Sequence, residues 1–400
     1  MPMEIRSEAL EVENMVQFVV IQYTQITHRI AFKSLPFPLE DALTHRVKGS
    51  QYTRLAMYIG ARVMQALMDC TDWQTYLVWI NDFHQQIANI PPDPLTGIEE
   101  LANRLDALHT TALFTFMLLS SSIGYSLYRR CMPIFLQLAS KFPELWTKDS
   151  AISILHALHA RRFEITQFVF VDTITALIFG IAPLLHYDTS FHDVNQPRDR
   201  SFEFLEWIYS CPPMIVFLLA KINSSRTLGL NGQADSNRLA HLEIEEHLQK
   251  WQPTTEKDED SSNGVVRLAV LECWRQAVLI YMYMGMCGAD SVDSRVQTAV
   301  RQMAQLASTV GSGSHFEGHL LIPCFIAGAA ARKEKHRTVF YSKIQASCSL
   351  KLAPLLLGRA ADFICVLNHL WHGAASEGRP ITWGDYVNSR FVALPLDINI

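Results

Sequence analysis

The sequence is low in glycine and proline and carries little excess charge. Its 400 residues include 18 glycines and 17 prolines, which is below the roughly 12% of average protein usage for the two together. Apolar residues make up 49% and charged residues 18%, a composition that excludes a chain disordered throughout. A chain of this length can bury one large core or two ordinary ones.

Several function classes also lack their usual signals. The formal net charge of -5 gives no broad attraction to the phosphates of nucleic acids. The N-terminal segment carries glutamates where a secretory signal has a basic stretch and an apolar core, so we do not expect secretion. No repeat recurs at a fixed period, which argues against a regular solenoid.

The eight cysteines show no metal-ligand spacing. The closest two, Cys273 and Cys287, are 14 positions apart, whereas zinc sites use pairs separated by a few residues. Most of the cysteines stand among apolar residues. We therefore expect reduced core thiols in an intracellular protein, with no metal and no cofactor.

What the sequence does have is helical periodicity. Apolar residues recur at spacings of three and four through the segments 8–33, 50–88, 97–141, 148–182, 201–222, 265–287, 291–309, 319–345 and 349–371. In 291–309 the predicted apolar stripe runs from Val292 to Leu306, with Asp290 or Ser291 as the cap. The pattern predicts an all-α fold without a significant sheet, as one large helical domain over residues 8–397.

Two polar segments interrupt the apolar pattern. Residues 222–237 are rich in Ser, Asn and Gly, and residues 252–264 are polar and acidic. Neither has enough apolar surface to bury. We predict that both are flexible surface segments within the domain.

The run from Ala107 to Tyr128 contains no Asp, Glu, Lys or Arg and is long enough to cross a bilayer. Its many Ser, Thr and Gly residues suit close helix packing in a membrane or in a tightly packed bundle. The second apolar run, 168–185, contains Asp172, and other apolar helices are interrupted by charges. We interpret 107–128 as one buried core helix, with an integral membrane protein as an alternative class.

No catalytic set is visible. His156 and His159 have a spacing that can hold a metal, but no third ligand stands beside them. Residues 311–319 read as a helix connector, and the basic run 332–337 reads as a solvated helix face because Glu334 interrupts it. Asp172 is interpreted as a hydrogen-bonding residue of the core rather than a catalytic acid. We expect that the chain is not an enzyme.

Several stretches in a shared order resemble the fungal-specific transcription factor domain, over about residues 100 to 390. They are "SSSIGYSLYRRCMPIFLQLA", "ARRFEITQFVFVDTITALIFGIAPLLHYD", "IEEHLQKWQP", "ECWRQAVLIYMYMGMCG", "LLIPCFIAGAAARKEKHR" and "ITWGDYV". The residues that match the family pattern, all read as structural, are Arg161, Arg162, Asp172, Gly180, Trp274, Arg275, Pro323, Ala327, Gly328 and Arg337.

The resemblance implies a nuclear regulator of RNA polymerase II transcription. It implies action through the transcription machinery, a sister regulator or a small-molecule effector. The six-cysteine zinc cluster that usually precedes this domain is not in the sequence. The chain is then either a domain-only member or the product of a gene model that lacks its first exons, and we expect no direct DNA binding by it. The alternative function is a helical scaffold without a transcriptional role.

Overall fold

A computed structural model describes residues 2–34, 37–91, 93–191, 204–230, 234–253, 261–349 and 358–396. Over these ranges the chain is mostly helical, and its two strands are two residues long each. The predicted all-α fold is confirmed. Buried apolar side chains from the first helix to the last join one continuous core.

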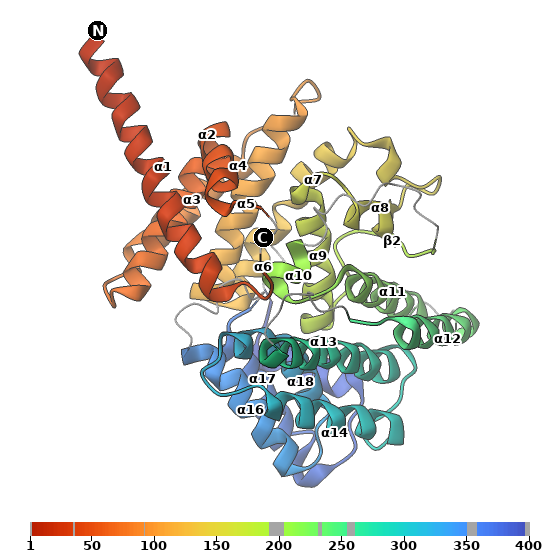
Figure 1. Ribbon diagram of the computed structural model, residues 1–400. Helices are drawn as coiled ribbons and strands as arrows, with labels where there is room; N and C mark the ends of the chain where they lie inside the picture. The colour runs from red at the N-terminus through yellow and green to blue at the C-terminus, as the bar shows by residue number, and fades with distance from the viewer. Residues whose placement is uncertain are drawn as a thin grey trace.

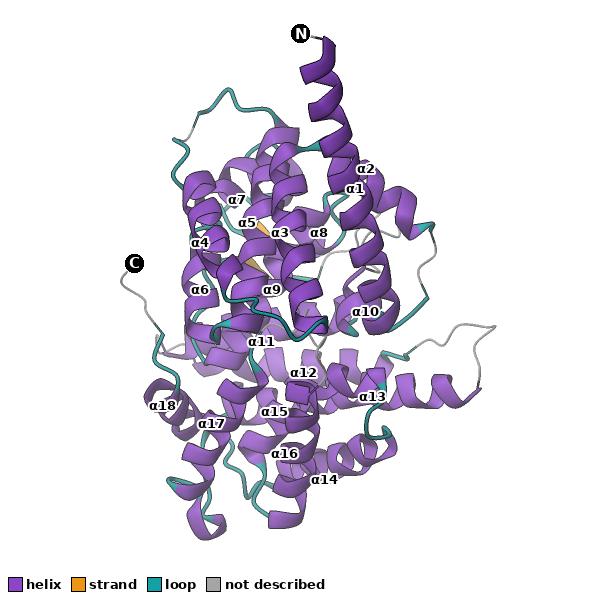
Figure 2. Cartoon of the chain, turned by 90° about the vertical axis from the view of Figure 1, so that its left-hand side faces the viewer, coloured by secondary structure: helices purple, strands orange, loops and turns teal. Residues whose placement is uncertain are grey.

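The first seven helices form the upper part of the molecule in Figure 1. They are α1 (Pro2–Ile30), α2 (Leu39–Gly49), α3 (Gln51–Met68), α4 (Thr75–Ala88), α5 (Ile98–Leu118), α6 (Ser121–Arg129) and α7 (Met132–Ala139). Helix α3 packs on α1, α2 and α5, and Figure 2 shows α1, α3 and α5 running upright beside one another.

Short elements and the longer helices α9, α11 and α12 follow. They are the 3-10 turn η1 (Pro143–Leu145), β1 (Ile152–Ser153), α8 (Ile154–Leu158), α9 (Phe163–Phe179), β2 (Tyr187–Asp188), α10 (Phe204–Tyr209), α11 (Pro213–Leu230) and α12 (Ala234–Lys250). The two strands pair in parallel, Ile152 with Tyr187 and Ser153 with Asp188.

The remaining helices form the lower part of Figure 1. They are α13 (Ser261–Tyr281), the π-helical turn η3 (Met282–Met286), α14 (Ser294–Thr309), the 3-10 turn η4 (His315–Leu320), α15 (Leu321–Ala330), α16 (Glu334–Ser349), α17 (Ala360–His372), the turn η5 (Ser376–Gly378) and α18 (Trp383–Ala393). Helix α13 packs on α14 and α15, and α17 packs on α16 and α18.

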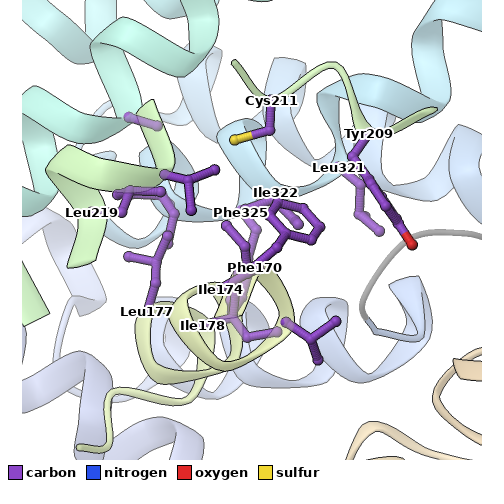
Figure 3. Close-up of a cluster of buried hydrophobic side chains, with 14 of the residues drawn as sticks. Phe170, Ile174, Leu177, Ile178, Tyr209, Cys211, Leu219, Leu321, Ile322 and Phe325 are labelled. Atoms are coloured by element: carbon purple, nitrogen blue, oxygen red, sulfur yellow. The ribbon is translucent and has the colours of Figure 1, made fainter. Parts of the chain in front are cut away.

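Helix α9 lies between the two parts. Every residue from Ile165 to Phe179 is buried, and α9 contacts both α5 and α11. Figure 3 shows Phe170, Ile174 and Leu177 of α9 in one apolar cluster with side chains of α11 and α15. The continuous apolar sequence of α9 follows from this position, because a helix that is enclosed on all sides has no polar face.

The sequence predicts a single helix over residues 107–128, but this run forms parts of two helices. Helix α5 ends at Leu118 and α6 begins at Ser121. The Ser120 side chain accepts a hydrogen bond from the backbone N–H of Ile123 at 3.1 Å, which caps α6. The serines that permit close packing also favour caps over helix interiors, and this local preference divides the run.

Two threonines of α5, Thr111 and Thr115, are buried with their hydroxyl groups paired inside the helix. The Thr111 and Thr115 hydroxyls donate to backbone carbonyls one turn earlier in α5. Among the helices of the described residues, none combines the length and the apolar character that crossing a bilayer requires.

The predicted flexible segments are partly wrong. Residues 222–230 continue α11, where Asn223 is buried and donates to the Thr173 carbonyl at 3.0 Å. The polar residues there serve helix packing, a use that composition does not reveal. Helices α12 and α13 also begin inside the predicted segments, at Ala234 and Ser261, while residues 231–233 and 254–260 lie outside the described residues.

The predicted α14 stripe and cap are shifted. Val296, Val300 and Met303 are buried as expected. Val292 precedes the helix and is exposed, because the cap is Asp293, whose carboxylate accepts from the Arg295 backbone N–H at 2.8 Å.

Candidate functional site

A cavity of about 400 Å³ opens among α1, α2, α3, α5, α9 and α10. This volume falls in the range of roughly 300 to 1,000 Å³ that is usual for small-molecule pockets. Its walls are largely apolar, and the apolar side chains that line it include Ile26, Ile30, Leu43, Met57, Met64, Leu113, Phe114, Phe163, Phe204, Trp207 and Ile208.

A glycine brings two of the wall residues together. A Cβ atom on Gly60 of α3 would lie 2.3 Å from the Phe114 ring and 2.6 Å from the Tyr23 hydroxyl. Both side chains line the cavity. Glycine at position 60 therefore lets α1 and α5 approach α3 closely enough to form one wall.

An ion pair marks the polar side of the cavity. Arg46 of α2 donates to both carboxylate oxygens of Asp106 of α5, with 3.2 Å between Nε and Oδ2. The Thr53 hydroxyl donates to the same Oδ2 at 3.2 Å. Asp106 is buried, and this bidentate pairing satisfies its charge. The Arg46 guanidinium also lies over the Phe163 ring, 5.4 Å from its centroid.

Three further polar atoms of the cavity lining are buried without a partner. Within the described part of the chain, Glu164 Oε2, Gln167 Oε1 and the Tyr23 hydroxyl oxygen take no part in a hydrogen bond. Burial, together with the Asp106 charge, raises the pKa of the Glu164 carboxyl. Burial likewise raises the pKa of the Tyr23 hydroxyl, which stays protonated and able to donate. A bound molecule could satisfy these atoms.

A buried histidine lies just behind this wall. The His109 ring stacks on Tyr128 and Phe168, with centroids 5.8 and 5.7 Å away. Burial lowers the pKa of His109 to about 4. His109 is therefore a neutral core residue at physiological pH.

The opposite end of α9 contrasts with the cavity, because its terminal carbonyls are paired. Arg226 donates to the Gly180 carbonyl at 3.0 Å and to the Ile181 carbonyl. Arg390 Nε donates to the Phe179 carbonyl at 2.8 Å, and the Tyr386 hydroxyl donates to that of Ile178. The two arginines also complement the negative end of the helix dipole. We call these three donors, Arg226, Tyr386 and Arg390, the α9 clamp.

Gly180 ends α9 beside the clamp. Its φ of +63° is left-handed, and a Cβ there would lie 2.4 Å from Val387 Cγ2 of α18. Glycine therefore meets a conformational and a packing requirement at once.

The other motif residues near α9 have separate places. Arg161 is exposed in the turn between α8 and α9, and Arg162 pairs with Glu99. Asp172 accepts hydrogen bonds from the Leu184 backbone N–H at 2.8 Å and from the Tyr187 hydroxyl at 2.7 Å. This is the core role that the sequence predicts. Burial raises the pKa of Asp172 to about 6, although its hydrogen bonds oppose that shift.

Trp274 and Arg275 belong to α13. Trp274 is buried, and its Nε1 donates to the Ser210 hydroxyl at 3.2 Å. Arg275 donates to the Trp251 carbonyl and lies over the Trp251 ring, 5.0 Å from its centroid. Both residues hold neighbouring segments together at a distance from the cavity lining.

Pro323, Ala327 and Gly328 are buried in α15. The Gly328 carbonyl accepts from Trp371 Nε1 at 2.9 Å. Arg337 is also buried and donates to the Ala331 and Ala375 carbonyls at 3.0 and 2.8 Å. None of these residues lines the cavity.

The interpretation of 332–337 as a solvated face is therefore wrong for part of it. Arg337 and His336 are buried, and Arg332 donates to the Gly378 carbonyl at 2.8 Å. These side chains hold the turn after α17, because an arginine can reach several carbonyls at once. Charge density in the sequence does not distinguish this internal use from a solvated face.

The histidine pair and the connector do not form a metal site. His156 contacts Ser153 at 2.9 Å, and His159 contacts the Leu155 carbonyl at 2.8 Å. In the connector, buried Glu317 pairs with Lys343 at 2.7 Å. Across the described ranges, no three His, Cys, Asp or Glu side chains gather as metal ligands would.

Sequence reasoning missed the residues at the cavity. A weak signal exists for Asp106, a carboxylate inside the apolar α5 segment, and for Glu164, at the start of the apolar α9. Buried charges require partners, but the sequence does not show that Arg46, 60 positions from Asp106, supplies one.

The family comparison covers well over half of the chain. A family model described as the fungal-specific transcription factor domain matches residues 95–396, so the chain belongs to this family. No curated protein and no solved structure gives a match. The matched segment contains α5 to α18. Helices α1 to α4 precede it, and of these α1, α2 and α3 supply part of the cavity wall.

Proposed function

We propose that the chain is a nuclear transcription regulator that acts on RNA polymerase II transcription through protein partners or a small effector. Membership of the fungal-specific transcription factor domain family carries this proposal. The partners are the transcription machinery or a sister regulator. The chain is proposed to have no enzymatic activity.

The positions of the basic residues support regulation without sequence-specific DNA binding by this chain. Specific readout needs side chains held against base edges, and much of the affinity comes from cations placed on phosphates. In the densest basic run, Arg337 is buried and Arg332 contacts a backbone carbonyl. These two arginines hold the fold together, so the exposed cations of the run are Lys333 and Lys335, which stand on either side of Glu334.

The polar groups at the cavity support binding rather than catalysis. Asp106 is occupied by Arg46 and Thr53, so it is not available as a base. Apolar walls with a few polar groups on one side are typical of ligand pockets.

A tethering experiment tests the proposal. The chain fused to a foreign DNA-binding domain should change output from a reporter that carries the matching sites, whereas the foreign domain alone should not. If the fusion leaves transcription unchanged under every growth condition tried, the proposal is wrong and the scaffold alternative is favoured.

A gel-shift assay at about 150 mM salt tests the proposal that the chain does not bind a specific DNA sequence directly. The untethered chain should bind duplex DNA without sequence preference and no tighter than roughly micromolar. Nanomolar affinity for one selected sequence would contradict indirect action.

A further inference from the structure

We propose that the cavity among α1, α2, α3, α5, α9 and α10 binds a small apolar amine, with its ammonium group on the Glu164 carboxylate and its apolar body against the aromatic wall. Calling this molecule an effector depends on the proposed transcriptional function. The binding site itself does not.

The apolar walls define the body of the ligand. The lining includes the aromatic rings of Phe114, Phe163, Phe204 and Trp207 among others, together with several aliphatic side chains. The volume of about 400 Å³ accommodates a molecule of modest size, and most of its binding free energy would come from apolar contact.

The unpaired oxygens define the head group. Glu164 Oε2 is buried without a hydrogen bond in the described structure, and a buried acceptor left unpaired is unfavourable because it has lost its hydrogen bonds to water. An ammonium group donates up to three hydrogen bonds. It can therefore satisfy Glu164 Oε2.

The charge balance of the cavity favours a cation over an anion. Arg46 and Asp106 neutralise each other through their bidentate contact, so an ionised Glu164 leaves one net negative charge. An ammonium cation restores neutrality, whereas a carboxylate ligand adds a second charge of the same sign.

Isothermal titration calorimetry with three probes of equal chain length tests this ligand class. The probes are octylamine, 1-octanol and octanoate, added to the full 400-residue chain. We expect octylamine to bind at least tenfold more tightly than octanoate, with 1-octanol between them. Equal affinities, a preference for octanoate, or no binding of octylamine up to about 1 mM would overturn the proposal.

Variants locate the binding. Glu164→Gln should weaken octylamine binding about tenfold and leave 1-octanol within about twofold, because only the cation loses its counter-charge. The matched control is Glu100→Gln, which removes an exposed carboxylate on a different helix, α5. It should change neither the octylamine affinity nor the 1-octanol affinity. Octylamine binding that is insensitive to Glu164→Gln would contradict the assignment.

A third variant guards against misfolding of Glu164→Gln. Ala42 is exposed on α2 and lines the cavity, so Ala42→Trp should fill the cavity without disturbing the core. It should abolish binding of octylamine and 1-octanol, and retained octylamine binding would place the site elsewhere. Amine binding that depends on Glu164 in a chain whose tethered fusion is inactive would refute the transcriptional function and leave this inference intact.

Discussion

The two ends of α9 use polar groups in opposite ways. At the C-terminal end, the carbonyls of Ile178, Phe179, Gly180 and Ile181 accept hydrogen bonds from the α9 clamp. At the N-terminal end, Glu164 Oε2 is buried beside a cavity and has no partner among the described residues.

This contrast separates a structural role from a binding role on one helix. Polar groups that are fully paired stabilise one arrangement of the fold. A buried polar group left unpaired costs stability, and proteins retain such costs mainly at functional sites. The C-terminal end of α9 therefore fastens the two parts of the molecule, and the N-terminal end is the place to look for a ligand.

Removing Arg226 should have the largest effect on the C-terminal end. Arg226→Ala leaves the Gly180 and Ile181 carbonyls without their donor. Hydrogen bonds to a charged group contribute roughly 1.5 to 3 kcal/mol each. We expect a loss of about 3 kcal/mol in the free energy of unfolding, measured by urea denaturation.

Arg301→Ala is the control for Arg226→Ala, because Arg301 is exposed on α14. It should change stability by less than about 0.5 kcal/mol. A loss for Arg226→Ala as small as that of the control would contradict the fastening role of the clamp.

The free energy of unfolding should depend on pH through His109, which packs on Phe168 in the N-terminal half of α9. The pKa of His109 is lowered from 6.5 to about 4, so the unfolded state takes up a proton in this range and the folded state does not. The contribution of His109 to stability is full above pH 6.5 and falls by about 1.4 kcal/mol per unit as the pH falls toward 4.

Urea denaturation at pH 7 and pH 5 measures this effect. His109→Gln should lose about 2 kcal/mol less than the wild type over this interval, whereas His45→Gln, at an exposed position, should lose as much as the wild type. An unaltered pH slope in His109→Gln would show that His109 is not held neutral.

Two glycine substitutions give the smallest and most selective test. Gly180 and Gly288 both have left-handed backbones, with φ of +63° and +69°, but a Cβ meets Val387 at Gly180 and nothing within 4 Å at Gly288. Gly288→Ala should cost about 1 kcal/mol for the backbone alone, and Gly180→Ala about 2 kcal/mol. Equal costs would mean that Val387 yields freely and that α18 is loosely held there.

The fold class followed from the sequence because helical periodicity is a local property. The apolar stripe of α14 and the enclosed sequence of α9 both indicate helices without knowledge of their neighbours. Helix limits were less predictable. The break at Ser120 and the continuation of α11 past Ile222 depend on caps and tertiary contacts such as that between Asn223 and Thr173.

The candidate site was not predictable in the same way. Arg46, Asp106 and Glu164 lie on three helices that are distant in the sequence, and only folding brings them to one cavity. The family resemblance points to residues such as Gly180, Trp274 and Arg337, whose contacts hold helices together. It gives no direct pointer to α1 and α2, which precede the matched segment.

Amide hydrogen exchange of the full chain with and without octylamine tests the contrast most directly. The account predicts that octylamine slows exchange in α10, in α2 and in the part of α1 that lines the cavity, leaves α18 unaffected, and gives less protection in Glu164→Gln at the same concentration. Protection centred on α18 and the C-terminal end of α9, or equal protection in Glu164→Gln, would contradict it.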